Sequence, residues 1–409
     1  MSATLDGPVA PVAPVAPVVS SAPAASAVAE SSDLPRIPVM IPWLGEEEAE
    51  AAAEAVRSGW VAQGPRVAEF ERAFAAEVGA AHGVAVSSGT TALHLGLVAL
   101  GVKAGDEVVV PSLSFIATAN AARYVGATPV FADVDLTTGN LTPETITAVL
   151  TPRTRAVILV HQGGVPADLD ALRGLCADRG LALLEDAACA AGVRYRDRSV
   201  GVGAQVAAWS FHPRKLLTTG EGGMVTTDDA EFAARMRRLR EHGMNVSAAE
   251  RHASSKPVLE AYLETGFNYR MTDIQAAVGL VQLRKLAPTV AERRRLAARY
   301  QRELAGIKGL TPVTDPEYGQ TNYQSFWVRL DERFPVTRDE LLLQLSDAGV
   351  SARRGIMAAH LEPAYADVST PRLPATEDLS LNSLILPVFH GMTDGQQDRV
   401  VAVLKAAGR

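Results

Sequence analysis

Residues 206–226 read VAAWSFHPRKLLTTGEGGMVT. Two apolar runs, over residues 206–210 and 224–226, predict two short β-strands. A polar turn and a glycine cluster separate the runs, and the turn carries Lys215. Of the chain's six lysines, Lys215 alone follows an expected strand end and precedes a glycine-rich turn. This segment therefore predicts two strands of the fold and contains the first candidate functional residue.

Short apolar runs alternate with helical stretches over most of the chain before this segment. Helices are expected over residues 46–56 and 67–78, and from Thr91 onward. Strands are expected over the runs at residues 84–86, 107–110, 128–131, 156–160 and 181–184. This alternation predicts an α/β fold with a mostly parallel central sheet that is flanked by helices.

The pattern changes after the last of these strands. An amphipathic helix is expected over residues 273–286, continuing past Pro288 to about Leu304. The later expected elements are a strand and two helices, over residues 325–330, 338–348 and 396–407. We predict a large domain over residues 37–287 and a smaller C-terminal α+β domain over residues 288–409.

Residues 1–36 are expected to form a disordered leader. A Pro-Val-Ala unit repeats three times between Pro8 and Ala16, which favours an extended polyproline helix. Because the first basic residue is Arg36, the segment lacks the positive start of a secretory signal peptide. No apolar stretch in the sequence is long enough to cross a membrane, so we expect no membrane partner.

Charge and cysteine content narrow the class of protein further. The formal net charge of -7 over 409 residues argues against a nucleic-acid-binding surface, which would need a concentrated basic face. The two cysteines, Cys176 and Cys189, cannot build a disulfide framework or a four-cysteine zinc site. We therefore predict no metal site and a reducing, cytoplasmic location.

Two residues at expected strand ends suit the chemistry of pyridoxal 5'-phosphate (PLP). Lys215 can form a Schiff base if its surroundings keep the amine neutral, although a surface lysine is the plain alternative. Asp186 follows a strongly apolar run, and a buried carboxylate needs a cationic partner. A protonated ring nitrogen would serve, as would the arginine of an ordinary salt bridge.

A phosphate and a flat ring would need further contacts. Residues 86–93, VSSGTTAL, form a strand end, a hydroxyl-rich turn and a helix start, where Ser88, Gly89 and Thr90 could bind phosphate. An ordinary helix N-cap is the alternative. No Walker A loop or dinucleotide fingerprint is present. Phe115, beyond another strand end, could stack on a ring or pack in the core.

The same segments resemble the DegT/DnrJ/EryC1/StrS family of PLP-dependent sugar aminotransferases, which has the aspartate aminotransferase fold (fold type I). The resemblance extends from about Ile37 to the C-terminus. Its most specific part is Ser210 to Gly223. Other matching segments lie at residues 59–65, 87–90, 126–131, 185–188 and 266–273.

The resemblance implies a role for each candidate residue. Lys215 would be the Schiff-base lysine and proton shuttle, and Asp186 would pair with the pyridine nitrogen. Gly89, Thr90 and Ser210, beside Ser88, would hold the phosphate, and Phe115 would stack on the ring. Asn268 would reach the cofactor phosphate of a neighbouring subunit, which implies a homodimer. Tyr323 and His360 would line the substrate pocket.

Two positions depart from the family pattern. Members often carry a glutamine where this chain has Cys189, near the cofactor's phenolic oxygen, and a thiol is a weaker hydrogen-bonding group. Many members have a histidine where Gln324 falls, which bears on substrate preference. A dehydratase relative replaces the lysine by histidine, and Lys215 argues against that activity here.

The expected function is an aminotransferase that moves an amino group from L-glutamate or L-glutamine to a keto-sugar, with a nucleotide-linked keto-sugar as the expected form. A cyclitol aminotransferase acting on a keto-inositol is the alternative enzyme. A non-catalytic PLP-binding regulatory protein is the alternative outside enzymes. The Arg- and Ala-rich composition suggests a high-GC bacterium, in which antibiotic-sugar biosynthesis is an associated setting.

Overall fold

The computed structural model describes residues 35–247, 251 and 255–409. The chain divides into two units, Met1–Pro35 and Arg36–Arg409, and every described helix and strand belongs to the second. The predicted leader lies almost wholly outside the described residues. Within the described part, no helix is both long and apolar enough to span a bilayer.

A seven-stranded sheet forms the centre of the second unit, in the order β1-β9-β8-β5-β4-β2-β3. Its strands are β1 (His82–Val86), β2 (Glu107–Pro111), β3 (Thr128–Ala132), β4 (Thr154–Val160), β5 (Ala182–Asp186), β8 (Val206–Ser210) and β9 (Gly223–Thr227). Only β9 runs against its neighbours, β1 and β8. The predicted mostly parallel sheet is confirmed.

Alternate residues of these strands enter two hydrophobic clusters on opposite faces of the sheet. Val108 and Val110 of β2 join one cluster, whereas Val109 joins the other. Helices cover both faces: α2 (Pro65–Val78), α5 (Pro143–Thr147) and α6 (Leu169–Arg179) on one, and α3 (Gly89–Ala99), α4 (Ala117–Tyr124) and α7 (Ala230–Leu239) on the other. Burial on both faces explains the apolar strands of the sequence.

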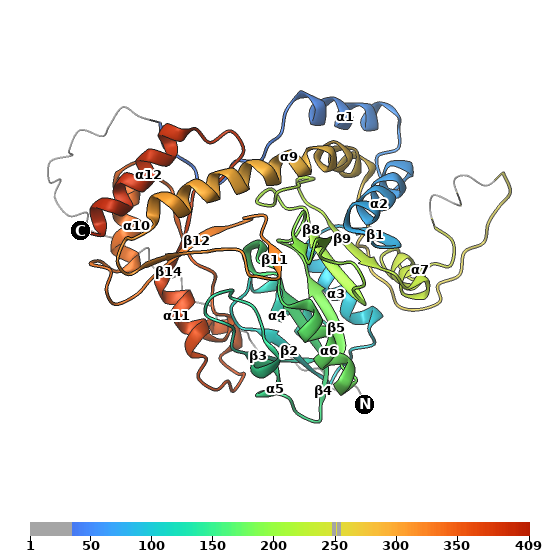
Figure 1. The fold of residues 1–409 in the computed structure, drawn as a ribbon. Helices are drawn as coiled ribbons and strands as arrows, with labels where there is room; N and C mark the ends of the chain where they lie inside the picture. The colour runs from blue at the N-terminus through green and yellow to red at the C-terminus, as the bar shows by residue number, and fades with distance from the viewer. Residues whose placement is uncertain (1–34, 248–250, 252–254) are drawn as a thin grey trace, which may run out of the picture. The chain divides into compact units, whose positions relative to one another are not determined.

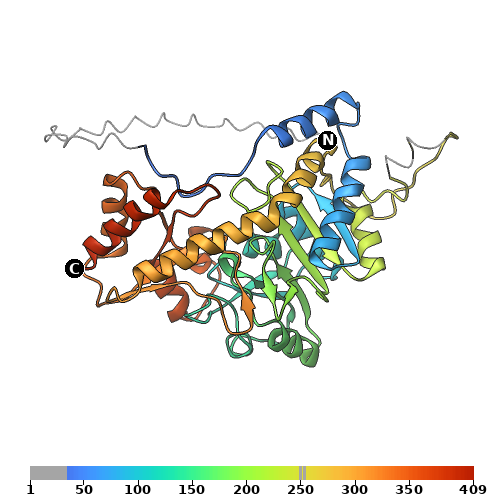
Figure 2. The same cartoon turned by 45° about the horizontal axis from the view of Figure 1, so that its top comes forward.

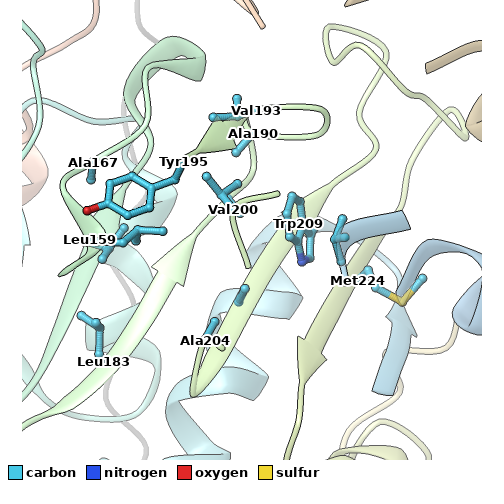
Figure 3. Close-up of a cluster of buried hydrophobic side chains, with 14 of the residues drawn as sticks. Leu159, Ala167, Leu183, Ala190, Val193, Tyr195, Val200, Ala204, Trp209 and Met224 are labelled. Atoms are coloured by element: carbon cyan, nitrogen blue, oxygen red, sulfur yellow. The ribbon is translucent and has the colours of Figure 1, made fainter. Parts of the chain in front are cut away.

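Side-chain contacts of Trp209 join the two strands that the Lys215 loop connects. Trp209 of β8 lies opposite Met224 of β9, and the two side chains share one face of the sheet (Figure 3). The indole Nε1 of Trp209 donates to Thr226 Oγ1 at 2.8 Å. The β8–β9 pair is therefore a rigid base for the loop that connects it.

The helix α9 (Asp273–Leu304) runs from α1 (Glu46–Arg57) and α2 to the C-terminal elements (Figures 1 and 2). Its continuation through Pro288 is confirmed. The C-terminal elements are β10 (Leu310–Pro312), β12 (Phe326–Leu330), β13 (Arg353–Arg354), β14 (Ser383–Leu386), α10 (Arg338–Asp347), α11 (Pro374–Asn382) and α12 (Asp394–Ala407). Because α9 crosses residue 287, the proposed domain boundary there stays a prediction.

The four C-terminal strands form an antiparallel sheet in the order β10-β12-β14-β13, with its own hydrophobic cluster. A small sheet joins β6 (Arg194–Tyr195), β7 (Arg198–Ser199) and β11 (Gly319–Gln320). Three short 3-10 helices complete the described elements: η1 (Gln162–Gly164), η2 (Ala359–Leu361) and η3 (Pro363–Tyr365). Each strand and helix expected from the sequence is present, with ends that differ by at most two residues.

The start of α2 depends on a carboxylate from α9. Gly64, at the N-cap of α2, has no side chain that could satisfy the first N–H groups of the helix. Asp273 accepts hydrogen bonds instead from the backbone N–H groups of Gly64, Arg66 and Val67, at 2.8, 3.1 and 2.9 Å. Its side chain is buried, so water cannot replace it.

We expect Asp273→Ala to destabilise the protein by about 2–3 kcal/mol, because it leaves buried donors without an acceptor. Thermal unfolding at a fixed protein concentration measures the loss. Asp229→Ala is the matched control, since Asp229 caps α7 with two exposed bonds and should cost about 1 kcal/mol. Equal losses for the two variants would contradict the capping role of Asp273.

Candidate active site

The predicted site residues at strand ends meet at one edge of the central sheet. Because β1, β5 and β8 are mutually parallel, their carboxyl ends lie together. Asp186 ends β5, Ser210 ends β8, and Ser88 follows β1 by two residues. A Cβ built on Gly89 would lie 2.7 Å from the Ser210 Cβ, so the start of α3 approaches β8 as closely as only glycine allows.

Lys215 lies in the loop between β8 and β9. Its backbone N–H donates to His212 O at 2.8 Å, and its Nζ donates to the Cys189 Sγ at 3.1 Å. The side chain is partly buried. Lys215 and Cys189, both singled out from the sequence, are therefore in direct contact.

Gln324 holds the loop on both sides of Lys215. Its Oε1 accepts from the Leu216 N–H at 3.1 Å, and its Nε2 donates to the Arg214 carbonyl at 2.6 Å. The side-chain amide therefore bridges the two peptide groups that flank the lysine. The sequence singled out Gln324 for substrate preference, whereas its contacts here are with the backbone of the lysine loop.

Asp186 is a buried carboxyl group with two hydrogen-bond donors. Thr118 Oγ1 donates to Oδ2 at 2.8 Å, and the Ala188 N–H donates to Oδ1 at 3.1 Å. Burial raises the pKa of Asp186, an effect that these two bonds and the charge of Lys215 offset in part. A further positive group at this carboxyl would stabilise its ionised form.

A second buried acid lies beside it. The Nε and Nη2 of Arg173 both donate to Glu185 Oε1, at 3.0 and 2.6 Å. The Nε2 of His161 lies 3.6 Å from Glu185 Oε2. Burial acts to raise the pKa of Glu185, but His161 and Arg173 outweigh it and lower the pKa. Glu185 thus has cationic and hydrogen-bonding partners within the protein, whereas Asp186 has no arginine partner in the described chain.

The turn before α3 forms a helix N-terminus that faces Ser210. Ser88 caps the helix by accepting from the Thr91 N–H at 3.1 Å. The N–H groups of Gly89 and Thr90 belong to the first turn, where no intrahelical acceptor exists. The ordinary N-cap and the predicted anion site are therefore both compatible with the same turn, and they do not exclude each other.

Phe115 is 65% exposed, although it follows a buried strand. The core-packing alternative for this ring is therefore wrong for the single chain. The residues around it are fixed, because Ser114 Oγ and Thr118 Oγ1 lie 2.7 Å apart and Thr118 donates to Asp186. The Phe115 carbonyl accepts from the Thr118 N–H, so an exposed aromatic ring lies on the segment that also contacts Asp186, and such a ring suits a flat ligand.

His360 lies against the same loop. Its Nδ1 is 2.6 Å from Ser112 Oγ, and residues 113 and 358 form an isolated antiparallel bridge. Burial lowers the pKa of His360, against the opposing effect of Glu377. The imidazole is thereby biased toward its neutral form. The C-terminal segment that carries His360 therefore borders the loop of Phe115.

Tyr323 and Asn268 lie apart from these contacts. The Tyr323 ring is 4% exposed in the C-terminal cluster, where its OH accepts from Gln301 at 3.0 Å and burial raises its pKa to about 12. Asn268 is exposed, and its backbone pairs with Glu241. Their substrate and cross-subunit roles stay predictions.

Sequence reasoning missed Thr118 and His161. His161 directly follows β4, its N–H donates to Asp186 O, and its Nδ1 accepts from Ala167. The rule that pointed to Asp186, a polar residue immediately after a buried strand, would have identified His161 as well. Thr118 lies on α4, and nothing in the sequence indicated its contact with Asp186.

These residues fit pyridoxal phosphate. The Asp186 carboxyl can pair with a pyridine N–H, and Lys215 can supply the amine. The N–H groups of Gly89 and Thr90, together with Ser210, can take the phosphate. No group of three or more metal-ligating side chains occurs among the described residues. A carboxyl for a ring nitrogen, N–H donors for a phosphate and an amine for a Schiff base together suit an organic, phosphate-bearing cofactor.

The chain is similar to characterised proteins along nearly its whole length. A model of the DegT/DnrJ/EryC1/StrS aminotransferase family matches residues 42–405. GDP-perosamine synthase of Caulobacter vibrioides is 41% identical over 377 residues, which are 91% of this chain and 98% of the relative.

Two of the solved structures that share the fold illustrate the likeness. The aminotransferase TlmJ from Streptoalloteichus hindustanus is 37% identical, with a TM-score of 0.84 over 91% of this chain and 98% of its own. Spr1654 from Streptococcus pneumoniae, solved in its PLP form, is 26% identical, with a TM-score of 0.85 over 91% and 98%. The predicted fold is confirmed by these neighbours. The chain belongs to the DegT/DnrJ/EryC1/StrS aminotransferase family, and it is an aminotransferase with pyridoxal phosphate as its cofactor.

Proposed function

We propose that the protein transfers an amino group from L-glutamate or L-glutamine to a keto-sugar, and that this sugar is linked to a nucleotide. The observation that carries the proposal is the contact of Lys215 with Cys189 at the sheet edge that also holds the buried carboxyl of Asp186. The relative with 41% identity is named for a GDP-linked product, which supports a nucleotide-linked acceptor.

The bound cofactor would carry the amino group between the two half-reactions and withdraw electrons from the substrate carbon. Lys215 Nζ would take the proton from that carbon and return it in the second half-reaction. Asp186, kept in place by Thr118, would keep the ring nitrogen protonated. Gln324 would keep the lysine loop in position while Nζ moves.

The remaining candidate residues would bind the cofactor and fix its orientation. Ser88, Gly89, Thr90 and Ser210 would hold the phosphate at the start of α3, where the helix dipole favours an anion. Phe115 would cover one face of the ring. Cys189, which contacts Lys215 Nζ, would face the phenolic oxygen in place of the family's glutamine.

On the substrate side, we propose that His360 and Tyr323 line the pocket. His360 is held by Ser112 beside the loop of Phe115, so its imidazole borders the space over the ring. For Tyr323 the support is positional: its carbonyl and that of Gln324 both bind Arg293 next to the lysine loop.

We also propose the setting of the reaction. The unpaired thiols of Cys176 and Cys189 support a reducing cytoplasm. The Arg- and Ala-rich composition supports a high-GC bacterial host and a role in amino-sugar formation for an antibiotic. No observation favours a keto-inositol acceptor or a regulatory role, and the response of the cofactor absorbance to amines and keto compounds distinguishes them.

Addition of L-glutamate to the PLP-loaded protein should bleach its visible absorbance, because the amino group passes to the cofactor. Addition of a nucleotide-linked keto-sugar should then restore the band and yield the amino sugar. Recovery with a keto-inositol alone would change the acceptor to a cyclitol. Visible absorbance that does not change on addition of glutamate, glutamine or other amines would overturn the enzyme proposal and favour the regulatory protein.

Lys215→Ala should lower the turnover rate by at least about 10³-fold, because it removes the proton-transfer group. Multiple-turnover kinetics with donor and acceptor measure the loss. Lys285→Ala is the control, since Lys285 pairs with Glu48 between α9 and α1, outside the contacts of the site. Turnover by Lys215→Ala within about tenfold of the native rate would contradict the role of Lys215.

We propose a homodimer in which Asn268 reaches the partner's cofactor phosphate. Asn268 is exposed, and nearby Leu259, Tyr262 and Leu263 expose 91%, 63% and 63% of their surface, which suits contact with a second copy. Light scattering should give about twice the 43.2 kDa chain mass. A monomer at micromolar concentration with full activity would contradict this arrangement.

A further inference from the structure

The exposed residue Asn268 lies between two aromatic residues that pack against the protein. The rings of Phe267 and Tyr269 are stacked, with 4.9 Å between their centroids and 7° between their planes, and both pack against the hydrophobic cluster that includes α3. Because successive side chains of an extended backbone point to opposite sides, the Asn268 side chain points away from this cluster. The two rings therefore fix the direction of Asn268.

His94 of α3 joins Tyr269 through a hydrogen bond. Its Nδ1 lies 2.9 Å from the Tyr269 hydroxyl, and its ring meets Phe267 edge to face, with 4.9 Å between the centroids. His94 is 7% exposed. Burial lowers the pKa of His94 and raises the pKa of Tyr269, so at neutral pH this is a hydrogen bond between two uncharged groups.

The Asn268 segment is also attached to the turn that is expected to bind phosphate. The Tyr269 carbonyl accepts from the Ser87 N–H at 2.8 Å, one residue before the N-cap of α3. A second backbone bond runs from the Tyr269 N–H to the Arg240 carbonyl at 2.9 Å. These bonds fix the main chain, whereas the bond to His94 fixes the Tyr269 ring against α3.

We propose that His94 is a positioning residue for the cofactor phosphate: by holding Tyr269, it keeps Asn268 in place to reach the phosphate in the partner subunit. His94 acts through Asn268 rather than by a contact of its own. An asparagine whose backbone is already ordered loses less conformational entropy when it binds, which strengthens the phosphate contact. The inference rests on the proposed function, through the homodimer and the role of Asn268.

The test compares the binding of PLP with that of pyridoxal, which lacks only the phosphate. Tyr269→Phe removes one oxygen and keeps the ring, and His94→Leu removes the other partner of the bond. Each variant should weaken PLP binding about three- to tenfold and leave pyridoxal binding unchanged. Equilibrium dialysis of the full-length, PLP-loaded protein against graded ligand, with the bound ligand read from its visible absorbance, measures both constants.

Two further variants separate positioning from a general loss of structure. His94→Asn, whose amide can take the place of Nδ1, should restore most of the PLP affinity that His94→Leu loses. Tyr300→Phe is the matched control, because it removes a tyrosine hydroxyl that donates to the Pro387 carbonyl at 3.0 Å in the C-terminal cluster. It should bind both ligands as the native protein does.

The route through Asn268 is tested by combining variants. In an Asn268→Ala background, Tyr269→Phe should cause no further loss of PLP affinity, because the contact that it supports is already absent. A full additional loss there, equal weakening of PLP and pyridoxal, or native PLP affinity in Tyr269→Phe would each overturn the proposal. Failure of the proposed function is distinguishable, because Asn268→Ala alone would then bind PLP as tightly as the native protein.

Discussion

The buried carboxyl group of Asp186 is the constraint on which the site depends. The carboxyl lies at the end of β5, between two parallel strands, and is buried from water. Among the described residues, only the Thr118 hydroxyl and the Ala188 N–H donate hydrogen bonds to it. Such a carboxyl is costly unless a cation joins it. The fold thus leaves this carboxyl in need of a positive partner, and we propose that a protonated ring nitrogen of the cofactor would be that partner.

The other candidate residues are positioned near this carboxyl by the order of the strands. The antiparallel strand β9 returns the chain after β8, and the connecting loop presents Lys215 beside β5 rather than on a distant helix. Gln324 and Arg293 then join this loop to the C-terminal sheet. Because both halves of the chain hold the loop, the position of the lysine depends on contacts between them.

Local sequence patterns predicted much of the fold. The features that they could not predict are contacts between residues far apart in the chain. Apolar runs and glycine turns predicted β5, β8 and the lysine loop, and a polar residue after each buried strand pointed to Asp186 and Ser210. No local pattern could pair Thr118 with Asp186 or Gln324 with the lysine loop, since these contacts join residues 68 and 108–110 positions apart. Likewise, the sequence could not decide whether the Phe115 ring is exposed or buried.

The central claim is that Lys215 is the amine that holds the cofactor. The PLP-loaded protein can be reduced with borohydride, which makes the link to the cofactor permanent, and digested for peptide mapping by mass spectrometry. With six lysines in the chain, the assignment is unambiguous. The account predicts the label on Lys215 alone. A label on any other lysine, or none on Lys215 in protein that retains its visible band, would contradict it.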